Sequence, residues 1–374
     1  MGVFVLLYSM NKEYDVIILG AGINGVASAK ALAQEGKSIL VIEKSHIASG
    51  ASSNSSRLIH GGLRYLENFD FGLVNESLKD QKYLLDTYAD LVKLRPFYLP
   101  LYNDSRRPAW MIRLGLWLYG FFARHNKKAQ GVLIEDFKSQ FKEINTQNLV
   151  AVFRYYDGKT DDDKLTHKIA EEAQDAGADI LEGTHVKSLI VENECIRLET
   201  EQGSVETKTL INATGAWVDE INEKYDLPSS YMIEKLSGIH LVIGRVLVPE
   251  PLILETASKR IFFIIPEKDC TLIGTTERSE NSLVDDIKVN DDDIEYLLKE
   301  SNRYLNKQLS RTDIKEVYIG TRPIIKSTKN PSEMSREFKL DLHSIGKVRF
   351  LHIYGGKLTT FPSLAKKVKD LLLK

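Results

Sequence analysis

The run Asp15-Val-Ile-Ile-Leu-Gly-Ala-Gly-Ile-Asn-Gly25 decides the fold of this chain. It opens as a short apolar stretch closed by glycine, which predicts a parallel strand buried on both faces. Small residues at helical spacing follow over residues 25–34, and Gly36 predicts the end of that helix. A second apolar run, residues 38–42, leads to Glu43. Strand, glycine turn, helix, strand and acid together predict a Rossmann-like, dinucleotide-binding α/β unit.

The three glycines suit a dinucleotide. Gly20 fits the tight turn, Gly22 the close approach to a pyrophosphate and Gly25 the helix–strand contact, while an acid at position 43 suits a ribose hydroxyl. This motif alone does not separate FAD from NAD. A second loop, Tyr354-Gly-Gly-Lys-Leu-Thr-Thr360, could place the N-terminus of a last helix against a flavin ring, where N–H groups stabilise negative charge. The pair predicts a flavoprotein with a discontinuous cofactor domain.

Composition narrows the classes of function. The net charge of -2 argues against non-specific nucleic-acid binding, which needs a cationic surface. Cys195 and Cys270 lack metal-ligand spacing, so we expect no metal site, no disulfide framework and a cytoplasmic location. No apolar run is long enough to span a bilayer. Residues 1–9 do not resemble a signal peptide; we expect either a frayed extension or a true start at Met10.

The remaining segments predict a mixed second domain and an α+β chain overall. Residues 73–143 are expected to be mostly helical, with breaks at Arg95-Pro96 and Arg107-Pro108, and residues 164–176 and 291–304 also fit helices. Alternating or apolar runs predict strands at 185–192, 195–200, 204–209, 209–213, 239–243, 260–266, 270–274 and 348–354. We expect an FAD-binding domain of residues 10–80, 155–230 and 330–374, and a substrate domain of residues 81–154 and 231–329.

Two further stretches indicate chemistry. The strand ending in Ala213-Thr214-Gly215 has small residues that leave room for a cofactor. The serine-rich segment 52–65 follows the dinucleotide unit, where the chain should cross the face of a flavin, and carries His60, Arg64 and Tyr65 beside a glycine pair. A histidine, a guanidinium and a phenol so close together suit an anionic, hydroxylated substrate.

The segment Ser55-Ser-Arg-Leu-Ile-His-Gly-Gly-Leu-Arg-Tyr-Leu-Glu67 resembles the signature of FAD-dependent glycerol-3-phosphate dehydrogenases and oxidases. Stretches 107–116, 212–215, 320–323 and 355–360 match that family in the same order. With the motifs above, the resemblance implies FAD contacts from Gly20, Gly22, Asn24, Gly25, Glu43, Lys44, Ser52, Ser53, Ser55, Ser56, Arg57, Leu58, Val186, Ala213, Thr214, Gly215, Trp217, Gly320, Gly355, Gly356, Lys357, Leu358 and Thr359. No cysteine falls in these loops, so we expect FAD to be bound non-covalently.

The resemblance also implies a reaction of glycerol metabolism. Arg322, Arg336 and Lys357 match the positions that hold a phosphate. Hydride would pass from C2 of sn-glycerol 3-phosphate, or from a close phosphorylated polyol, to flavin N5; with sn-glycerol 3-phosphate the product would be dihydroxyacetone phosphate. Either His60 or His240 would accept the hydroxyl proton, with Arg64 and Tyr65 orienting the glycerol end.

Several points stay open at this level. The acceptor of electrons is quinone or O₂, and the oligomeric state is not predicted. The family's longer members have a further helical domain after the last loop, and the resemblance implies that this chain is a shortened form without it. The apolar, arginine-flanked segment 106–124 could rest on the inner face of the cytoplasmic membrane, although an internal helix of the substrate domain is the favoured interpretation.

Two alternative functions also remain. One is oxidation of another small 2-hydroxy acid or amino acid, which would need a carboxylate clamp but not three separate cations. The other is non-catalytic FAD binding, which has no chemical need for His60, Arg64 and Tyr65.

Overall fold

The computed structural model describes residues 10–62, 70–123, 127–192, 194–326 and 338–373, which form three sheets. The central sheet has six strands in the order β19-β20-β12-β2-β3-β8, and β19 alone runs antiparallel to its neighbour. Its strands are β19 (Lys339–Ile345), β20 (Val348–Tyr354), β12 (Thr209–Asn212), β2 (Val16–Leu19), β3 (Ile39–Ile42) and β8 (Asp179–Leu181). The predicted strand–helix–strand unit is therefore confirmed, and it lies beside strands from the middle and the end of the chain.

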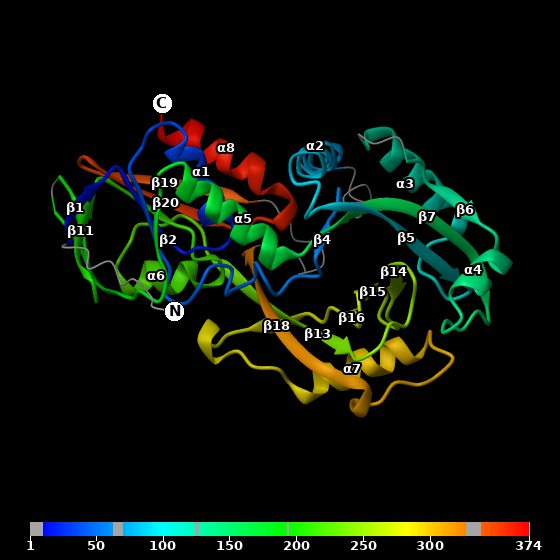
Figure 1. Cartoon of the computed structure of the whole chain (residues 1–374). Helices are drawn as coiled ribbons and strands as arrows, with labels where there is room; N and C mark the ends of the chain where they lie inside the picture. The colour runs from blue at the N-terminus through cyan, green and yellow to red at the C-terminus, as the bar shows by residue number, and fades with distance from the viewer. Residues whose placement is uncertain (1–9, 63–69, 124–126, 193, 327–337, 374) are drawn as a thin grey trace, which may run out of the picture.

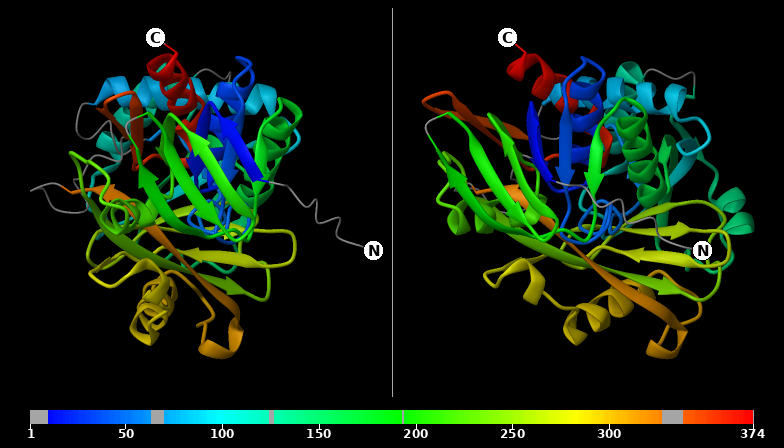
Figure 2. Two further views of the ribbon diagram at one scale, coloured as in Figure 1. Left: turned by 90° about the vertical axis from the view of Figure 1, so that its left-hand side faces the viewer. Right: turned by 60° about the vertical axis from the view of Figure 1, so that its left-hand side comes forward.

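Helices cover one face of the central sheet and a second sheet covers the other (Figures 1 and 2). The helices are α1 (Ile23–Ala33), α5 (Asp162–Asp175) and α8 (Phe361–Leu372), the last preceded by the 3₁₀ turn η6 (Leu358–Thr360). The covering sheet has the order β1-β11-β10-β9, from β1 (Met10–Tyr14), β11 (Gly203–Thr207), β10 (Ile196–Thr200) and β9 (Val186–Val191). This arrangement confirms the predicted antiparallel ribbon and adds β1 to it.

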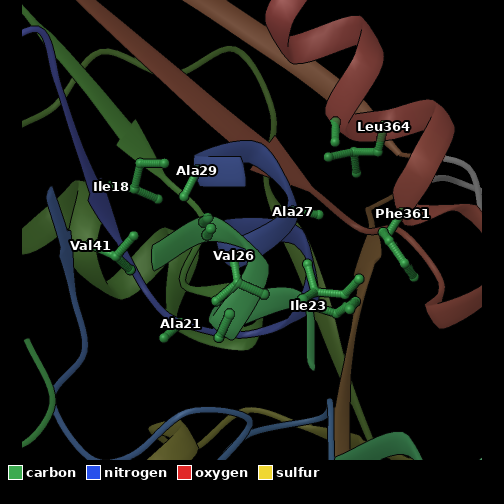
Figure 3. Packing of buried hydrophobic residues seen from close by; sticks show 14 of the residues in the cluster. Ile18, Ala21, Ile23, Val26, Ala27, Ala29, Val41, Phe361 and Leu364 are labelled. Atoms are coloured by element: carbon green, nitrogen blue, oxygen red, sulfur yellow. The ribbon is translucent and has the colours of Figure 1, made fainter. Parts of the chain in front are cut away.

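Alternate residues of the central strands serve two cores. Ile18 and Val41 face the helices and pack with Val26 of α1, as Figure 3 shows beside Leu364 of α8. Ile17 packs on the opposite face, in the cluster shared with the four-stranded sheet. Both faces are thus sealed by apolar side chains, which explains the continuous apolar character of β2 and β3.

The largest sheet forms the second half of the molecule, in the order β17-β13-β16-β15-β14-β5-β7-β4, with β18 paired to β13 and β6 to β7. Its strands are β4 (Leu58–Ile59), β5 (Lys93–Tyr102), β6 (Gln130–Val132), β7 (Leu149–Lys159), β13 (Ile233–Ile243), β14 (Leu252–Glu255), β15 (Ile261–Pro266), β16 (Thr271–Gly274), β17 (Arg278–Glu280) and β18 (Ile314–Ile325). The remaining elements are helices α2 (Phe71–Thr87), α3 (Ala109–Phe122), α4 (Ile134–Gln140), α6 (Val218–Lys224) and α7 (Asp291–Asn302), and 3₁₀ turns η2 (Gly215–Trp217), η3 (Val284–Asp286) and η4 (Arg311–Asp313). Strand β7 runs through the expected domain boundary at residues 154/155, and the domain division stays a prediction.

The expectation of mainly helical structure over residues 73–143 is wrong at β5. This strand contains Pro96 and Pro100, yet it pairs along its length with β7. The N–H of Tyr98, between the two prolines, donates to Pro251 O on the opposite side at 2.9 Å. Because alternate N–H groups of a strand point the same way, the prolines remove no donor from the β5–β7 ladder. The two prolines therefore lie on the side of this strand that faces β14, where pairing is limited to Tyr98, and they do not mark a helix break.

The favoured interpretation of segment 106–124 as an internal helix is wrong for one face of α3. Within α3 only Leu116 and Tyr119 are buried. Trp110 and Trp117 are each 65% exposed, and Phe121 is 75% exposed. The helix therefore packs along one edge and presents aromatic side chains outward.

Candidate functional site

The two glycine loops meet across one cavity of about 720 Å³. Asn24 Nδ2 donates to Gly355 O at 3.3 Å, which ties the first helix to the last loop. Most predicted cofactor contacts line this cavity: Gly20, Gly22, Asn24, Glu43, Lys44, Ser52, Ser55, Ser56, Leu58, Val186, Ala213, Thr214, Gly215, Trp217, Gly355, Gly356, Lys357, Leu358 and Thr359. Segments more than 330 residues apart in sequence are thus brought to one surface.

The first glycine loop has the shape that a pyrophosphate requires. Gly20 adopts a φ of +97°, a conformation that side chains disfavour. A Cβ on Gly25 would lie 2.0 Å from Gly20 O, so only glycine lets α1 approach the loop. Helix α1 begins after Gly22, which has no side chain to cap it, and Ser52 Oγ accepts from Ile23 N at 2.9 Å. A helix N-terminus open to a cavity favours an anion, so these residues fit the diphosphate of FAD.

Glu43 lies at the end of β3 and accepts hydrogen bonds through both carboxylate oxygens. One oxygen accepts from Ala21 N at 2.8 Å and the other from Ser45 N at 2.9 Å. The side chain is buried but still lines the cavity. Each carboxylate oxygen has capacity for a further hydrogen bond, so Glu43 can hold the loop and still accept from a ribose hydroxyl.

Ser53 and Arg57 do not line the cavity. Ser53 Oγ donates to Ala48 O at 2.8 Å, which closes the loop on itself. Arg57 lies with its guanidinium 3.6 Å from Asp162 and 3.4 Å from Glu267. Both residues hold the serine-rich segment in place, and contact with the cofactor stays a prediction for them.

Gly25 and Gly320 are also outside the cavity lining, and both mark close backbone packing. A Cβ on Gly320 would lie 2.6 Å from Asn54 O. This contact lets β18 approach the serine-rich segment. Both glycines therefore allow neighbouring backbone segments to pack closely, and contact with the cofactor stays a prediction for them.

His60 lines the cavity on a backbone segment that is fixed from both sides. Its own N–H donates to Thr359 Oγ1 at 3.1 Å, on the loop of the predicted cofactor site. The preceding residue, Ile59, accepts at its carbonyl from Gln81 Nε2 at 2.8 Å. The following N–H, of Gly61, donates to Tyr119 OH at 2.9 Å. The imidazole is therefore carried by a rigid stretch of chain.

The fully buried carboxylate of Asp157 accepts hydrogen bonds from the polar groups that hold the chain around His60. It accepts from Gln81 Nε2 at 2.6 Å, Tyr119 OH at 2.7 Å and Gly61 N at 3.3 Å. Burial raises the pKa of Asp157 to about 7, and the hydrogen bonds from Tyr119 and Gln81 oppose that rise. Sequence reasoning missed this network, because its members lie on three different elements.

His240, the second histidine predicted as a base, is 1% exposed on β13 and is not among the residues that line the cavity. Its Nε2 lies 2.8 Å from Oγ of Ser56, which does line the cavity. Its ring stacks on Tyr318 with centroids 4.9 Å apart. Burial first, and then the nearby charges of Arg322 and Arg57, lower the pKa of His240 to about 3.

Arg322 and Lys357, two of the predicted phosphate ligands, both line the cavity. Arg322 projects from β18 and donates to Thr275 Oγ1 at 2.8 Å. A Cβ on Gly238, on the neighbouring strand, would lie 2.4 Å from Thr276 O, 2.5 Å from Thr275 Oγ1 and 3.0 Å from the Arg322 guanidinium. Glycine at 238 therefore allows β13 to pack closely against residues 275 and 276 as well as against this arginine. Arg64, Tyr65 and Arg336 lie outside the described residues, so their predicted roles are untested.

Sequence reasoning missed part of the lining of this cavity. Phe263 and Arg260 from the β15 region line the cavity, with Arg106, Arg107 and Lys259. Arg260 forms an ion pair with Glu277 at 2.6 Å. A cationic residue before the β15 strand was the available signal, but such charges are usually solvated. Both cysteines lie outside this lining, and no metal-binding cluster of His, Cys, Asp or Glu occurs among the described residues.

Comparison with known proteins agrees with this geometry. Residues 15–371 match the family described as FAD dependent oxidoreductase. A glycerol-3-phosphate dehydrogenase of Pseudomonas tolaasii is 37% identical over 95% of this chain and 70% of its own length. A D-erythritol 1-phosphate dehydrogenase of Brucella abortus is 34% identical over 94% of this chain and 72% of its own length.

Solved structures share the fold. The glycerol-3-phosphate dehydrogenase of Bacillus halodurans, complexed with FAD, superimposes with a TM-score of 0.76 at 22% identity, over 97% of this chain and 64% of that chain. The L-alpha-glycerophosphate oxidase of Mycoplasma pneumoniae, with FAD bound, gives 0.77 at 19% identity, over 97% and 95% of the two chains. This chain thus spans less than two thirds of the Bacillus protein and nearly all of the Mycoplasma protein.

Proposed function

The chain belongs to the family of FAD-dependent oxidoreductases, and from that premise we propose that it oxidises the secondary alcohol of sn-glycerol 3-phosphate. One observation carries the proposal: His60, Arg322 and Lys357 line the same cavity as both glycine loops. FAD, when bound, supplies the acceptor for the hydride. A base and two cations beside its site provide what a phosphorylated alcohol needs.

Each residue has a chemical task in this proposal. The guanidinium of Arg322 presents a planar set of donors that matches phosphate oxygens. Lys357, which precedes the 3₁₀ turn η6, adds a second positive charge. His60 accepts the proton of the substrate hydroxyl, because a neutral imidazole is a suitable acceptor near pH 7. Phe263 adds an apolar ring to the lining of the same cavity, and apolar lining helps to exclude water from the reaction.

The proposal is tested by anaerobic bleaching of the purified yellow protein. We expect sn-glycerol 3-phosphate to bleach the visible absorbance of the flavin. The rate of bleaching should be about 1 s⁻¹ or faster, which lies in the usual range of enzyme turnover. D-erythritol 1-phosphate, glycerol and glycine are the comparison substrates. Bleaching by glycine or by a 2-hydroxy acid alone would contradict the assignment to a phosphorylated alcohol. A protein that bleaches with none of them would favour non-catalytic FAD binding.

We further propose that α3 rests on an anionic bilayer. Trp110, Leu114, Trp117 and Phe121 follow one exposed helical stripe, at spacings of four, three and four residues. The surrounding sequence, residues 105–134, contains six Lys or Arg residues and no Asp or Glu. An aromatic face with cationic flanks matches an interfacial helix on anionic lipid. Among the described residues, no helix has the length and apolarity to cross a membrane.

Vesicle binding is expected to depend on this stripe. The double variant Trp117→Ser, Phe121→Ser should bind anionic vesicles at least about 10-fold more weakly than wild type, because it removes two large apolar side chains from the interface. Co-sedimentation with phosphatidylglycerol vesicles, at low and high salt, measures this. Leu283→Ser is the matched control, since Leu283 is 59% exposed on another part of the chain. Equal binding of the double variant and wild type would contradict the docking of α3.

The electron acceptor is a separate question, with quinone and O₂ as the two candidates. A bilayer beside α3 would bring a membrane quinone close to the flavin site. Reoxidation of the bleached protein by air and by a soluble quinone separates the two acceptors.

A further inference from the structure

His240 and Ser56 form a pair that connects a buried strand to the cavity. Ser56 lines the cavity, and its Oγ lies 2.8 Å from Nε2 of His240, which does not line it. The other ring nitrogen, Nδ1, is fully inaccessible and has no hydrogen-bond partner among the described residues. Nε2 is therefore the ring nitrogen at which a proton would find a hydrogen-bond acceptor.

The ring is held neutral by its surroundings. Tyr318 stacks on one face, and a Cβ on Gly274 would lie 2.3 Å from His240 Cδ2, so β16 packs directly against the ring. The charged groups nearest to it are the cations Arg322 and Arg57, which disfavour an imidazolium. The only hydrogen-bonding neighbour among the described residues is the hydroxyl of Ser56.

A neutral imidazole carries one N–H. If the proton were on Nδ1, a buried donor would have no acceptor, and orphaned buried N–H groups are rare because they cost the full desolvation of the donor. If the proton is on Nε2, it donates to Ser56 Oγ and leaves only a lone pair unpaired at Nδ1. The second arrangement is the less costly one. It also occupies the Ser56 oxygen as an acceptor, so the serine proton must point elsewhere.

Resting on the proposed function, we propose that Ser56 is a hydrogen-bond donor aimed into the cavity, and that His240 is the positioning residue that fixes its direction and not the base. The group it serves is an acceptor that gains electron density during the reaction, on the substrate oxygen or on the flavin ring. A donor of fixed direction costs no reorganisation when that charge develops. His60 then remains as the base.

The first test reads the tautomer directly. In the holoenzyme with ¹⁵N-labelled histidine, we expect NMR to show His240 protonated at Nε2 and unprotonated at Nδ1, unchanged between about pH 5 and 8, the range in which an unperturbed histidine titrates. Loss of these signals in His240→Gln assigns them. A proton on Nδ1, or a titration in this range, would overturn the proposal. This measurement is independent of whether sn-glycerol 3-phosphate is the substrate.

The second test removes the donor. Ser56→Ala should lower kcat by about 10²-fold with a smaller change in KM, since the donor acts on charge that develops in the transition state. Ser56→Thr, which keeps a hydroxyl, should restore much of that loss. A lower flavin reduction potential in substrate-free Ser56→Ala places the acceptor on the flavin, and an unchanged potential places it on the substrate. Unchanged kcat and unchanged potential together would refute a donor role.

Discussion

His60→Ala is expected to lower kcat for sn-glycerol 3-phosphate by about 10²-fold or more, the contribution typical of a general base. The loss should appear in the chemical step, measured as the rate of anaerobic flavin bleaching at saturating substrate. FAD content should stay near that of wild type, because the backbone N–H of His60, not its imidazole, holds Thr359.

The size of this effect depends on how rigidly His60 is held. Gln81 and Tyr119 fix the residues on either side of it, and both also bond to Asp157. A base carried on such a segment is already in position when substrate binds, which is where most of its catalytic value lies.

His46→Ala is the matched control, because His46 is exposed and, among the described residues, its ring makes a polar contact only with its neighbour Ser45. It should bleach as fast as wild type. A His60→Ala protein that bleaches at the wild-type rate would remove His60 from the role of base.

The dinucleotide unit was predictable because its signals are local. Glycine spacing, small helical residues and Glu43 lie within 24 residues of Gly20, and each reports its own backbone or packing requirement. The meeting of the two chain ends was predictable for a different reason: both loops suit the same cofactor, and Asn24 indeed contacts Gly355.

Other parts of the site could not be predicted because their partners are distant in sequence and carry no periodicity. The carboxylate of Asp157 meets Gln81 and Gly61 at separations of 76 and 96 residues. Likewise, nothing in the local pattern shows that Pro96 lies on the side of β5 that faces away from β7, which is why a helix break was expected there. Tertiary pairing overrides the usual meaning of proline in this strand.

Arg322→Ala is expected to lower kcat/KM for sn-glycerol 3-phosphate by about 10²-fold or more, because a charge-assisted pair of hydrogen bonds to phosphate is lost and the substrate is no longer oriented. Arg322→Lys keeps the charge but loses the planar donor set, so its activity should fall between the alanine variant and wild type. Steady-state rates with an artificial acceptor measure both variants.

The decisive comparison for Arg322 is the preference for a phosphorylated over an unphosphorylated alcohol. Wild type should strongly prefer sn-glycerol 3-phosphate to glycerol, and Arg322→Ala should narrow this ratio while leaving the slow oxidation of glycerol nearly unchanged. If Arg322→Ala kept the full preference for phosphate, the anion would be held elsewhere, and the cations Arg260 and Lys259, which line the same cavity, would become the next residues to replace.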